Sequence, residues 1–162
     1  MVAISLFKKA WTGFNLLLGK ADHIDSLKSR IDDIIHNDSN IMKYDPDIYY
    51  ESRIKSFERI VSKIKNKKKL PKDIYGVRIV YNSNYKNDEY IAYYIKYAID
   101  KEFRNTFYCK DYIVNPKKNG YKSLHFGIWD DNCLYDIQIR NVEMDYWAKH
   151  GGASNYYPSN QE

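Results

Sequence analysis

The order of apolar patterns along the chain predicts an α/β (α+β) fold, with a mixed β-sheet of about five strands flanked by helices. Helical spacing alternates with strand patterns in the first two-thirds of the sequence, and three strand patterns then follow closely. Strands separated by helices favour at least one parallel pairing, whereas strands close in sequence favour antiparallel pairing. A chain of 162 residues suffices for one core, so we predict a single domain over 1–162, with N-terminal helices in 1–40 and a core at 47–151.

Two amphipathic helices are predicted before the first strand. Residues 3–19 place Phe7, Trp11 and Phe14 on one side at helical spacing, and residues 22–36 repeat the pattern. The apolar side of the first helix predicts docking on the core or on another subunit, and a membrane-surface helix is the alternative. Residues 38–46 are expected to form a loop.

The next three elements are a strand, a helix and a second strand. The strand covers residues 48–55, and Ser56 is suited to cap the helix after it. Pro71 prevents continuation of that helix. The second strand starts at Asp73, and Gly76 within it indicates close backbone approach or a bulge.

The rest of the chain alternates less regularly. A helix is predicted over 89–102, followed by strands at about 107–114, 121–129 and 133–140, and by a closing helix at 142–150. Asp130-Asp131-Asn132 joins the last two strands as a hairpin turn.

Composition narrows the function classes. The net charge of +5 favours an anionic partner without choosing between nucleotide, RNA and acidic membrane. Two cysteines make no metal motif or disulfide framework, which predicts a reducing, cytoplasmic location. No apolar run is long enough to span a membrane, and no Walker A or dinucleotide-binding glycine motif occurs.

The segment KDYIVNPKKNGYKSLH, residues 110–125, contains the strongest functional pattern. Two turn signals interrupt a strand pattern, and Lys117, Lys118 and Lys122 surround Tyr121. Lysines neutralise phosphate, and an aromatic ring can stack on a base for about 1–3 kcal/mol. The segment is therefore suited to a phosphorylated ligand with a flat base. A polar hairpin with solvated lysines and no ligand would have the same sequence pattern.

Charged residues on three strands are expected to meet at one end of the sheet. Arg53 and Lys55 share a strand face, and Lys63 follows on the next helix. The other two groups are Asp73 with Arg78, and the period-two set Asp136, Gln138 and Arg140. Two carboxylates among cations can hold Mg²⁺ and polyphosphate, whereas a half-exposed antiparallel strand is the simpler interpretation of the last set.

Together these segments resemble the synthetase domain of the RelA/SpoT family, the alarmone ((p)ppGpp) synthetases. The resemblance covers about 100 residues, from Glu51 to Gly151, in the family's order. Its segments are ESRIKS (51–56), DIYGVRIV (73–80), KDYIVNPKKNGYKSLH (110–125), DIQIRN (136–141) and MDYWAKHG (144–151).

The resemblance implies a nucleotidyltransferase-like fold and Mg²⁺-dependent transfer of pyrophosphate from ATP to the 3′-hydroxyl of GDP or GTP. By position it implies that Arg53 packs on adenine, that Asp73 and Asp136 bind the metal, and that Tyr121 stacks on guanine. The other implied ATP-side residues are Lys55 and Lys63, and the other implied acceptor-side residues are Lys117, Lys122, His125, Gln138 and Arg140. We also assign Arg78 to the ATP side and Asn119 to the acceptor side.

The sequence departs from the family at one reacting position, where Asp136 replaces the usual glutamate and Asn141 ends the strand. A shorter carboxylate can keep the metal and lose base geometry, so a weak or inactive nucleotide-binding homologue remains an alternative. Others are a toxin-type relative that pyrophosphorylates the tRNA 3′ end and a general RNA-binding protein. A small single-domain synthetase is expected, with homo-oligomer formation through the N-terminal or C-terminal helix as a further expectation.

Overall fold

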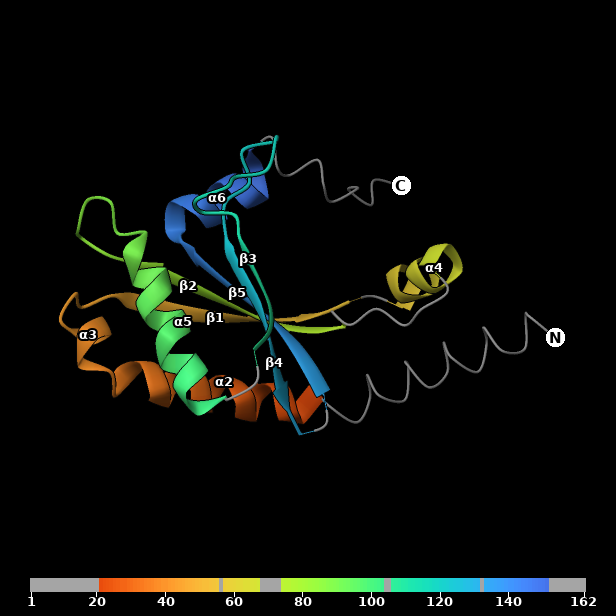
Figure 1. Ribbon diagram of the computed structural model, residues 1–162, viewed down its shortest axis with the longest axis horizontal. Helices are drawn as coiled ribbons and strands as arrows, with labels where there is room; N and C mark the ends of the chain where they lie inside the picture. Colours follow the sequence, from red (N-terminus) through yellow and green to blue (C-terminus); the bar gives the residue numbers. More distant parts are fainter. Residues whose placement is uncertain (1–20, 56, 68–73, 104–105, 132, 152–162) are drawn as a thin grey trace.

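The computed structural model describes residues 21–55, 57–67, 74–103, 106–131 and 133–151, and these form one mixed sheet with helices on both faces (Figure 1). The predicted helix over 3–19 lies outside the described residues. The elements, in chain order, are α2 (Ala21–His36), α3 (Ser39–Met42), β1 (Asp47–Ile54), α4 (Phe57–Lys67), β2 (Tyr75–Asn82), α5 (Tyr90–Glu102), β3 (Thr106–Asp111), β4 (Leu124–Asp130), β5 (Cys133–Asn141) and α6 (Val142–His150).

The five strands lie in the order β1-β2-β5-β4-β3, which confirms the predicted mixed sheet. β2 and β5 are parallel, and the other three pairs are antiparallel. The expected parallel pair therefore exists, but between β2 and β5. β1 and β2 are antiparallel although α4 separates them in sequence.

One face of the sheet forms the apolar core against α2 and α5, which lie on the same side in Figure 1. Ile137 and Ile139 of β5 are fully buried there, with Ile31 of α2 and Ile95 of α5. Each such side chain contributes about 1.5–3 kcal/mol when it is taken from water. The alternation along β5 turns Asp136, Gln138 and Arg140 to the opposite face.

α6 packs on that opposite face. Asn141 starts the helix by accepting a hydrogen bond from the backbone N–H of Met144 at 2.9 Å. The same side chain donates to Asp88 at 2.8 Å. Asn141 is thus a structural residue at the junction of β5 and α6.

Two local expectations are resolved by the structure. The segment 38–46, predicted as a loop, contains the short helix α3, because Asp38 caps it by accepting from the backbone N–H of Asn40. Gly76 does mark a close approach, since a Cβ there would lie 2.9 Å from the backbone oxygen of Asp136.

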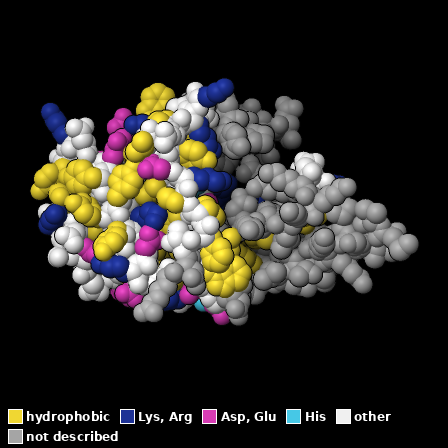
Figure 2. All heavy atoms as spheres, viewed as in Figure 1, with side chains coloured by type: hydrophobic (Ala, Val, Ile, Leu, Met, Phe, Trp, Pro, Cys, Tyr) yellow, Lys and Arg dark blue, Asp and Glu magenta, His cyan; other side chains and the backbone are white. Residues whose placement is uncertain are grey.

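The surface of this part of the chain mixes charges of both signs with exposed aromatic side chains (Figure 2). Tyr97, Phe107 and Tyr146 are among the exposed aromatics. Within the described residues, no helix is both long and apolar enough to cross a membrane.

Candidate active site on the polar face of the sheet

Strand register places the candidate side chains in two rows across the polar face. The first row joins Arg53 to Gly76, Gly76 to Asp136, and Asp136 to Gly127. Both strand neighbours of Asp136 are glycines, but on the β4 side the ring of Tyr108 lies over Gly127. On the β2 side Gly76 has no side chain, which leaves room for a ligand to approach the carboxylate.

The second row runs through Glu51, Arg78, Gln138, His125 and Lys110, one on each strand. The row is polar across all five strands of the sheet, with cationic, anionic and neutral groups next to one another. The polar face predicted for β5 therefore continues across the other four strands of the sheet.

The Asp136 carboxylate is held by two side chains. The hydroxyl of Tyr108 donates to Oδ1, and Nε2 of Gln138 donates to Oδ2 at 2.7 Å. A carboxylate has about four lone-pair directions, so each oxygen keeps capacity for a further partner. The group is oriented and still able to accept a metal ion or a proton.

An ion-pair network around the buried carboxylate of Asp145 joins α6 to the sheet. Asp145 accepts from Nη1 of Arg140 at 3.1 Å and from Lys149 at 2.7 Å, while Arg78 and Lys149 both pair with Glu51. Burial alone would raise the pKa of the Asp145 carboxyl, but the hydrogen bond and charge of Lys149 and the nearby arginines hold it below its usual value. α6 is thereby tied to β5, β2 and β1.

Arg140 also connects this network to the predicted stacking ring. Its Nη2 donates to the hydroxyl of Tyr121, and the same hydroxyl lies 2.8 Å from Nε2 of His125. Tyr121 accepts from arginine, which leaves its own proton available for donation to an unprotonated Nε2 of His125. Burial, with the charges of Arg140 and Lys117, lowers the pKa of His125 to about 3, so its imidazole is neutral.

The turn that carries Tyr121 is built by its neighbours. Gly120 adopts a φ of 78°, in the left-handed region that favours glycine, and Asn119 accepts from the backbone N–H of Tyr121 at 3.2 Å. Lys117 lies 4.7 Å from the Tyr121 ring centroid, and Lys122 pairs with Glu89 at 2.9 Å.

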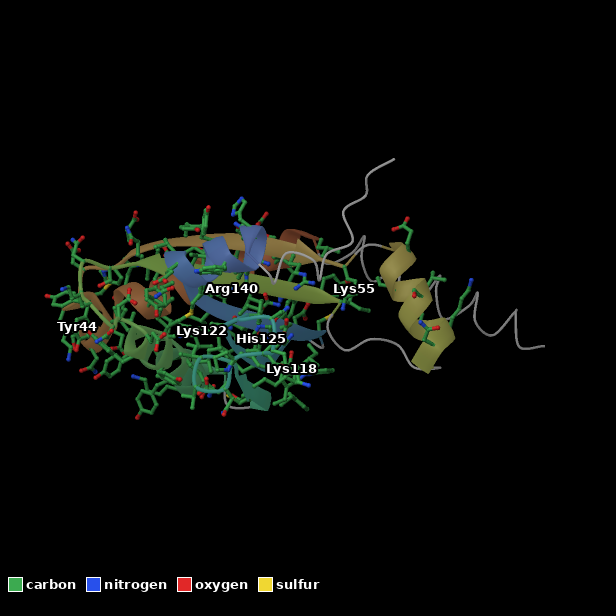
Figure 3. All side chains as sticks on the ribbon, turned by 90° about the horizontal axis from the view of Figure 1, so that it is seen from above. Tyr44, Lys55, Lys118, Lys122, His125 and Arg140 are labelled. Atoms are coloured by element: carbon green, nitrogen blue, oxygen red, sulfur yellow. The ribbon has the colours of Figure 1, made fainter. Side chains whose placement is uncertain are left out.

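The structure brings most of the predicted site residues together. In Figure 3, Lys118, Lys122, His125 and Arg140 lie between Tyr44 and Lys55, and α4 lies beyond Lys55. Lys55 is buried at the end of β1, where its backbone N–H bonds the carbonyl of Ile74 at 2.9 Å. Asp73 and the side chain of Lys63 lie outside the described residues.

Four residues of this face were not predicted from the sequence as site residues. Tyr108, Glu51 and Asp145 contact predicted residues, and Lys149 pairs with Glu51 and Asp145. A partial signal existed in the i, i+4 spacing of Asp145 and Lys149. In the part of the chain that the structure describes, no group of three or more His, Cys, Asp or Glu side chains is placed to hold a metal ion.

One polar face with cations on four strands and an aromatic turn beside it suits a phosphorylated ligand, because phosphoryl transfer depends on positioning and charge neutralisation. The family described as "Region found in RelA / SpoT proteins" matches residues 52–162. The chain belongs to the RelA/SpoT family.

Curated relatives agree with this assignment. GTP pyrophosphokinase YwaC of Bacillus subtilis is 34% identical over 142 residues, which are 77% of this chain and 66% of YwaC. The probable GTP diphosphokinase CRSH of Arabidopsis thaliana chloroplasts is 28% identical, over 85% of this chain and 26% of that protein. The chain thus spans only part of the length of these relatives.

Solved structures share the fold. Small alarmone synthetase 2 from Bacillus subtilis superposes with a TM-score of 0.65 at 29% identity, covering 91% of this chain and 82% of that one. Small alarmone synthetase 1 from the same organism, bound to its product pppGpp, gives 0.62 at 24% identity and covers 94% and 84%. The predicted synthetase-type fold is confirmed.

Proposed function

We propose that the chain is a (p)ppGpp synthetase that transfers pyrophosphate from ATP to the 3′-hydroxyl of GDP or GTP. Family membership and the names of its relatives support this activity. A reducing cytoplasm supplies these nucleotides and suits a chain whose described cysteines, Cys109 and Cys133, are both free thiols.

The observation that carries the proposal is a continuous hydrogen-bonded path across the polar face. Gln138 bonds Asp136 on one side and Arg140 on the other, at 2.7 and 3.3 Å. Arg140 in turn bonds Tyr121. The path holds a carboxylate able to take a proton and a ring able to stack on a base in one fixed arrangement, as a transfer reaction requires.

The chemistry needs one proton acceptor and several cations. The acceptor's 3′-oxygen bonds to the β-phosphorus of ATP, the bond from that phosphorus to the α–β bridging oxygen breaks, and AMP leaves. The hydroxyl proton passes to the Asp136 carboxylate. Arg53, Lys55, Lys63 and Arg78 are proposed to bind ATP, with Arg53 stacking on adenine because a guanidinium can stack and bind phosphate at once.

On the acceptor side, Tyr121 is proposed to stack on guanine, with Lys117, Asn119 and Lys122 around the phosphates and the base. Gln138, His125 and Arg140 act through the neighbours that they hold. Arg140 is 1% exposed, so its proposed role is to orient Tyr121 rather than to bind the acceptor directly.

Mg²⁺ is the proposed cofactor, with Asp136 and Asp73 as its protein ligands. The residues present fit it, since Asp136 offers carboxylate oxygens with unused lone pairs, and its neighbour Gly76 has no side chain. Mg²⁺ typically takes one or two carboxylates plus substrate phosphates. When bound, the ion neutralises charge on the transferred phosphates.

The test is incubation with γ-labelled ATP and Mg²⁺, separately with GDP, GTP and tRNA, followed by separation of the labelled products. Labelled guanosine tetra- or pentaphosphate is expected, and Asp136→Asn should abolish it. Label on tRNA alone would show a toxin-type acceptor. No labelled product with any acceptor would refute the synthetase.

A further inference from the structure

Tyr108 donates a hydrogen bond to the Asp136 carboxylate from outside β5. It comes from β3, two strands away from β5 in the sheet, with β4 between them. The phenol therefore crosses an entire strand to reach its partner. A contact over that distance requires a side chain on the polar face and an unobstructed path.

Ordinary alternation along β3 places the side chain on the polar face. Lys110 pairs with His125 and Cys109 with Phe126, so Tyr108, two residues before Lys110, shares its face, and Lys110 Nζ lies 5.6 Å from the Tyr108 ring centroid. Next to this position β3 carries a β-bulge, since three steps from Thr106 to Cys109 match two steps from Ile128 to Phe126. Bulges recur beside active sites.

Gly127 leaves the path open. A Cβ at this position of β4 would lie 2.6 Å from Cε1 of Tyr108 and 3.1 Å from its Cδ1. The first distance is shorter than real Cβ contacts and the second is tight, so the Tyr108 ring lies where any other residue would have its side chain. The glycine makes room for this one contact.

We propose that Tyr108 is a positioning residue that fixes the Asp136 carboxylate for proton transfer from the acceptor hydroxyl. The assignment rests on the proposed pyrophosphate transfer. Tyr108 fixes Oδ1 and Gln138 fixes Oδ2, so the short side chain of Asp136 is held at both oxygens. Without the phenol the carboxylate would rotate about its own bond and lose alignment with the acceptor.

The first test is Tyr108→Phe, which removes the hydroxyl and keeps the ring. A hydrogen bond to a charged group is worth about 10- to 100-fold in rate when it acts on the reacting group, so kcat should fall by about that factor. KM for ATP and for the acceptor should stay within about twofold, because the phenol does not touch either in this scheme. The matched control is Tyr97→Phe, which also removes a phenol but from an exposed position on α5.

Gly127→Ala should break the same hydrogen bond between Tyr108 and Asp136 in a second way, because its Cβ displaces the Tyr108 ring and leaves the hydroxyl intact. Its kcat should fall like that of Tyr108→Phe. In the double variant the two losses should not add, because both break one contact. An unchanged kcat in Tyr108→Phe, or a loss that appears in KM instead, would overturn the assignment.

A measurement independent of activity separates this assignment from the synthetase proposal. With ¹³Cζ-labelled tyrosine, the Tyr108 resonance is identified by its absence in Tyr108→Phe. Asp136→Asn should shift that resonance while leaving Tyr97 in place. If the wild-type protein transfers no pyrophosphate, the proposed function is refuted. The contact between Tyr108 and Asp136 is tested separately by the resonance, and a Tyr108 resonance that does not move in Asp136→Asn refutes the positioning role.

Discussion

The hydroxyl of Tyr121 is shared between Arg140 and His125, so this residue offers an aromatic face and a fixed orientation at once. The two contributions can be separated by substitution. Tyr121→Ala removes the ring and should raise the acceptor KM by about 10- to 100-fold, in line with about 1–3 kcal/mol for base stacking. The measurement is steady-state kinetics with each nucleotide varied in turn.

Tyr121→Phe keeps the stacking face and serves as the matched variant. It should raise the acceptor KM by only about 3- to 10-fold, the effect of one lost hydrogen bond. KM for ATP should change little in either variant. An equal rise for both nucleotides would mean that Tyr121 supports the fold rather than the acceptor.

The length of the carboxylate at position 136 gives a second residue-scale prediction. A glutamate there would raise activity if Asp136 were one methylene too far from the acceptor. The contacts with Tyr108 and Gln138 favour the opposite result, because a longer side chain cannot keep both. We expect Asp136→Glu to lower kcat by about 10-fold or more, as measured by product formation at saturating nucleotide. A gain in kcat would show that the aspartate is too short for its task.

At the residue scale, the sequence predicted which side chains share a face when all of them lie on one strand. The shared face of Asp136, Gln138 and Arg140 followed from period two, and the structure confirms it through their mutual hydrogen bonds. The contact of Tyr108 with Asp136 could not be found this way, because it depends on the order of the strands in the sheet and on a glycine in the strand between them. The pattern within one strand shows neither.

At the scale of elements, α6 is held to the polar face by the ion pair of Asp145 and Arg140. Both side chains are buried. Removing one charge from a buried pair costs about 3–5 kcal/mol, because the other charge is left uncompensated. We expect Asp145→Asn to lower the free energy of unfolding by about this amount in urea denaturation at pH 7.

The pH dependence of that loss follows from the lowered pKa of Asp145. The folded state binds a proton at this carboxyl less readily than the unfolded chain does, so the stabilisation is present above the ordinary aspartate pKa of about 4. It is lost as the pH falls through the lowered folded-state pKa. The difference between wild type and Asp145→Asn should therefore shrink in acid. As a control, Glu143→Gln on the exposed side of α6 should change stability little.

Element types were predictable because each has a clear apolar period, and the boundaries of α6 and β5 agree closely with the pattern. Pairing was less predictable. The antiparallel β1–β2 pair contains a helix in its connection, and the sequence does not show that α4 leads the chain away from and back to the same edge. The helix α3 was missed because four residues are too few for a period.

At the scale of the whole molecule, the site is assembled from nearly the full length of the described chain. Glu51 of β1, His125 of β4 and Asp145 of α6 are joined through Arg78 and Arg140. Loss of the fold therefore means loss of the site. Conversely, a group that the site keeps neutral at a pH where the unfolded chain would protonate it should lower the free energy of unfolding of the whole domain.

His125 is such a group. Its folded-state pKa is about 3, whereas an unfolded histidine titrates near about 6.5. Below the unfolded-state pKa, the unfolded chain binds a proton at this histidine and the folded protein does not. The free energy of unfolding therefore decreases as the pH falls below that pKa. Between pH 7 and 5 this single group should cost about 2 kcal/mol, before carboxyl groups begin to titrate.

The corresponding variant is His125→Gln, whose amide can still accept from Tyr121 and does not titrate. The free energy of unfolding, measured in urea between pH 7 and 5, should fall in the wild type by about 2 kcal/mol more than in this variant. His150→Gln, at the exposed end of α6, should retain the wild-type slope. Equal slopes for wild type and His125→Gln would mean that the imidazole can be protonated in the folded state. The neutral hydrogen bond between His125 and the Tyr121 hydroxyl, and with it the orientation proposed for the stacking ring, would then have to be abandoned.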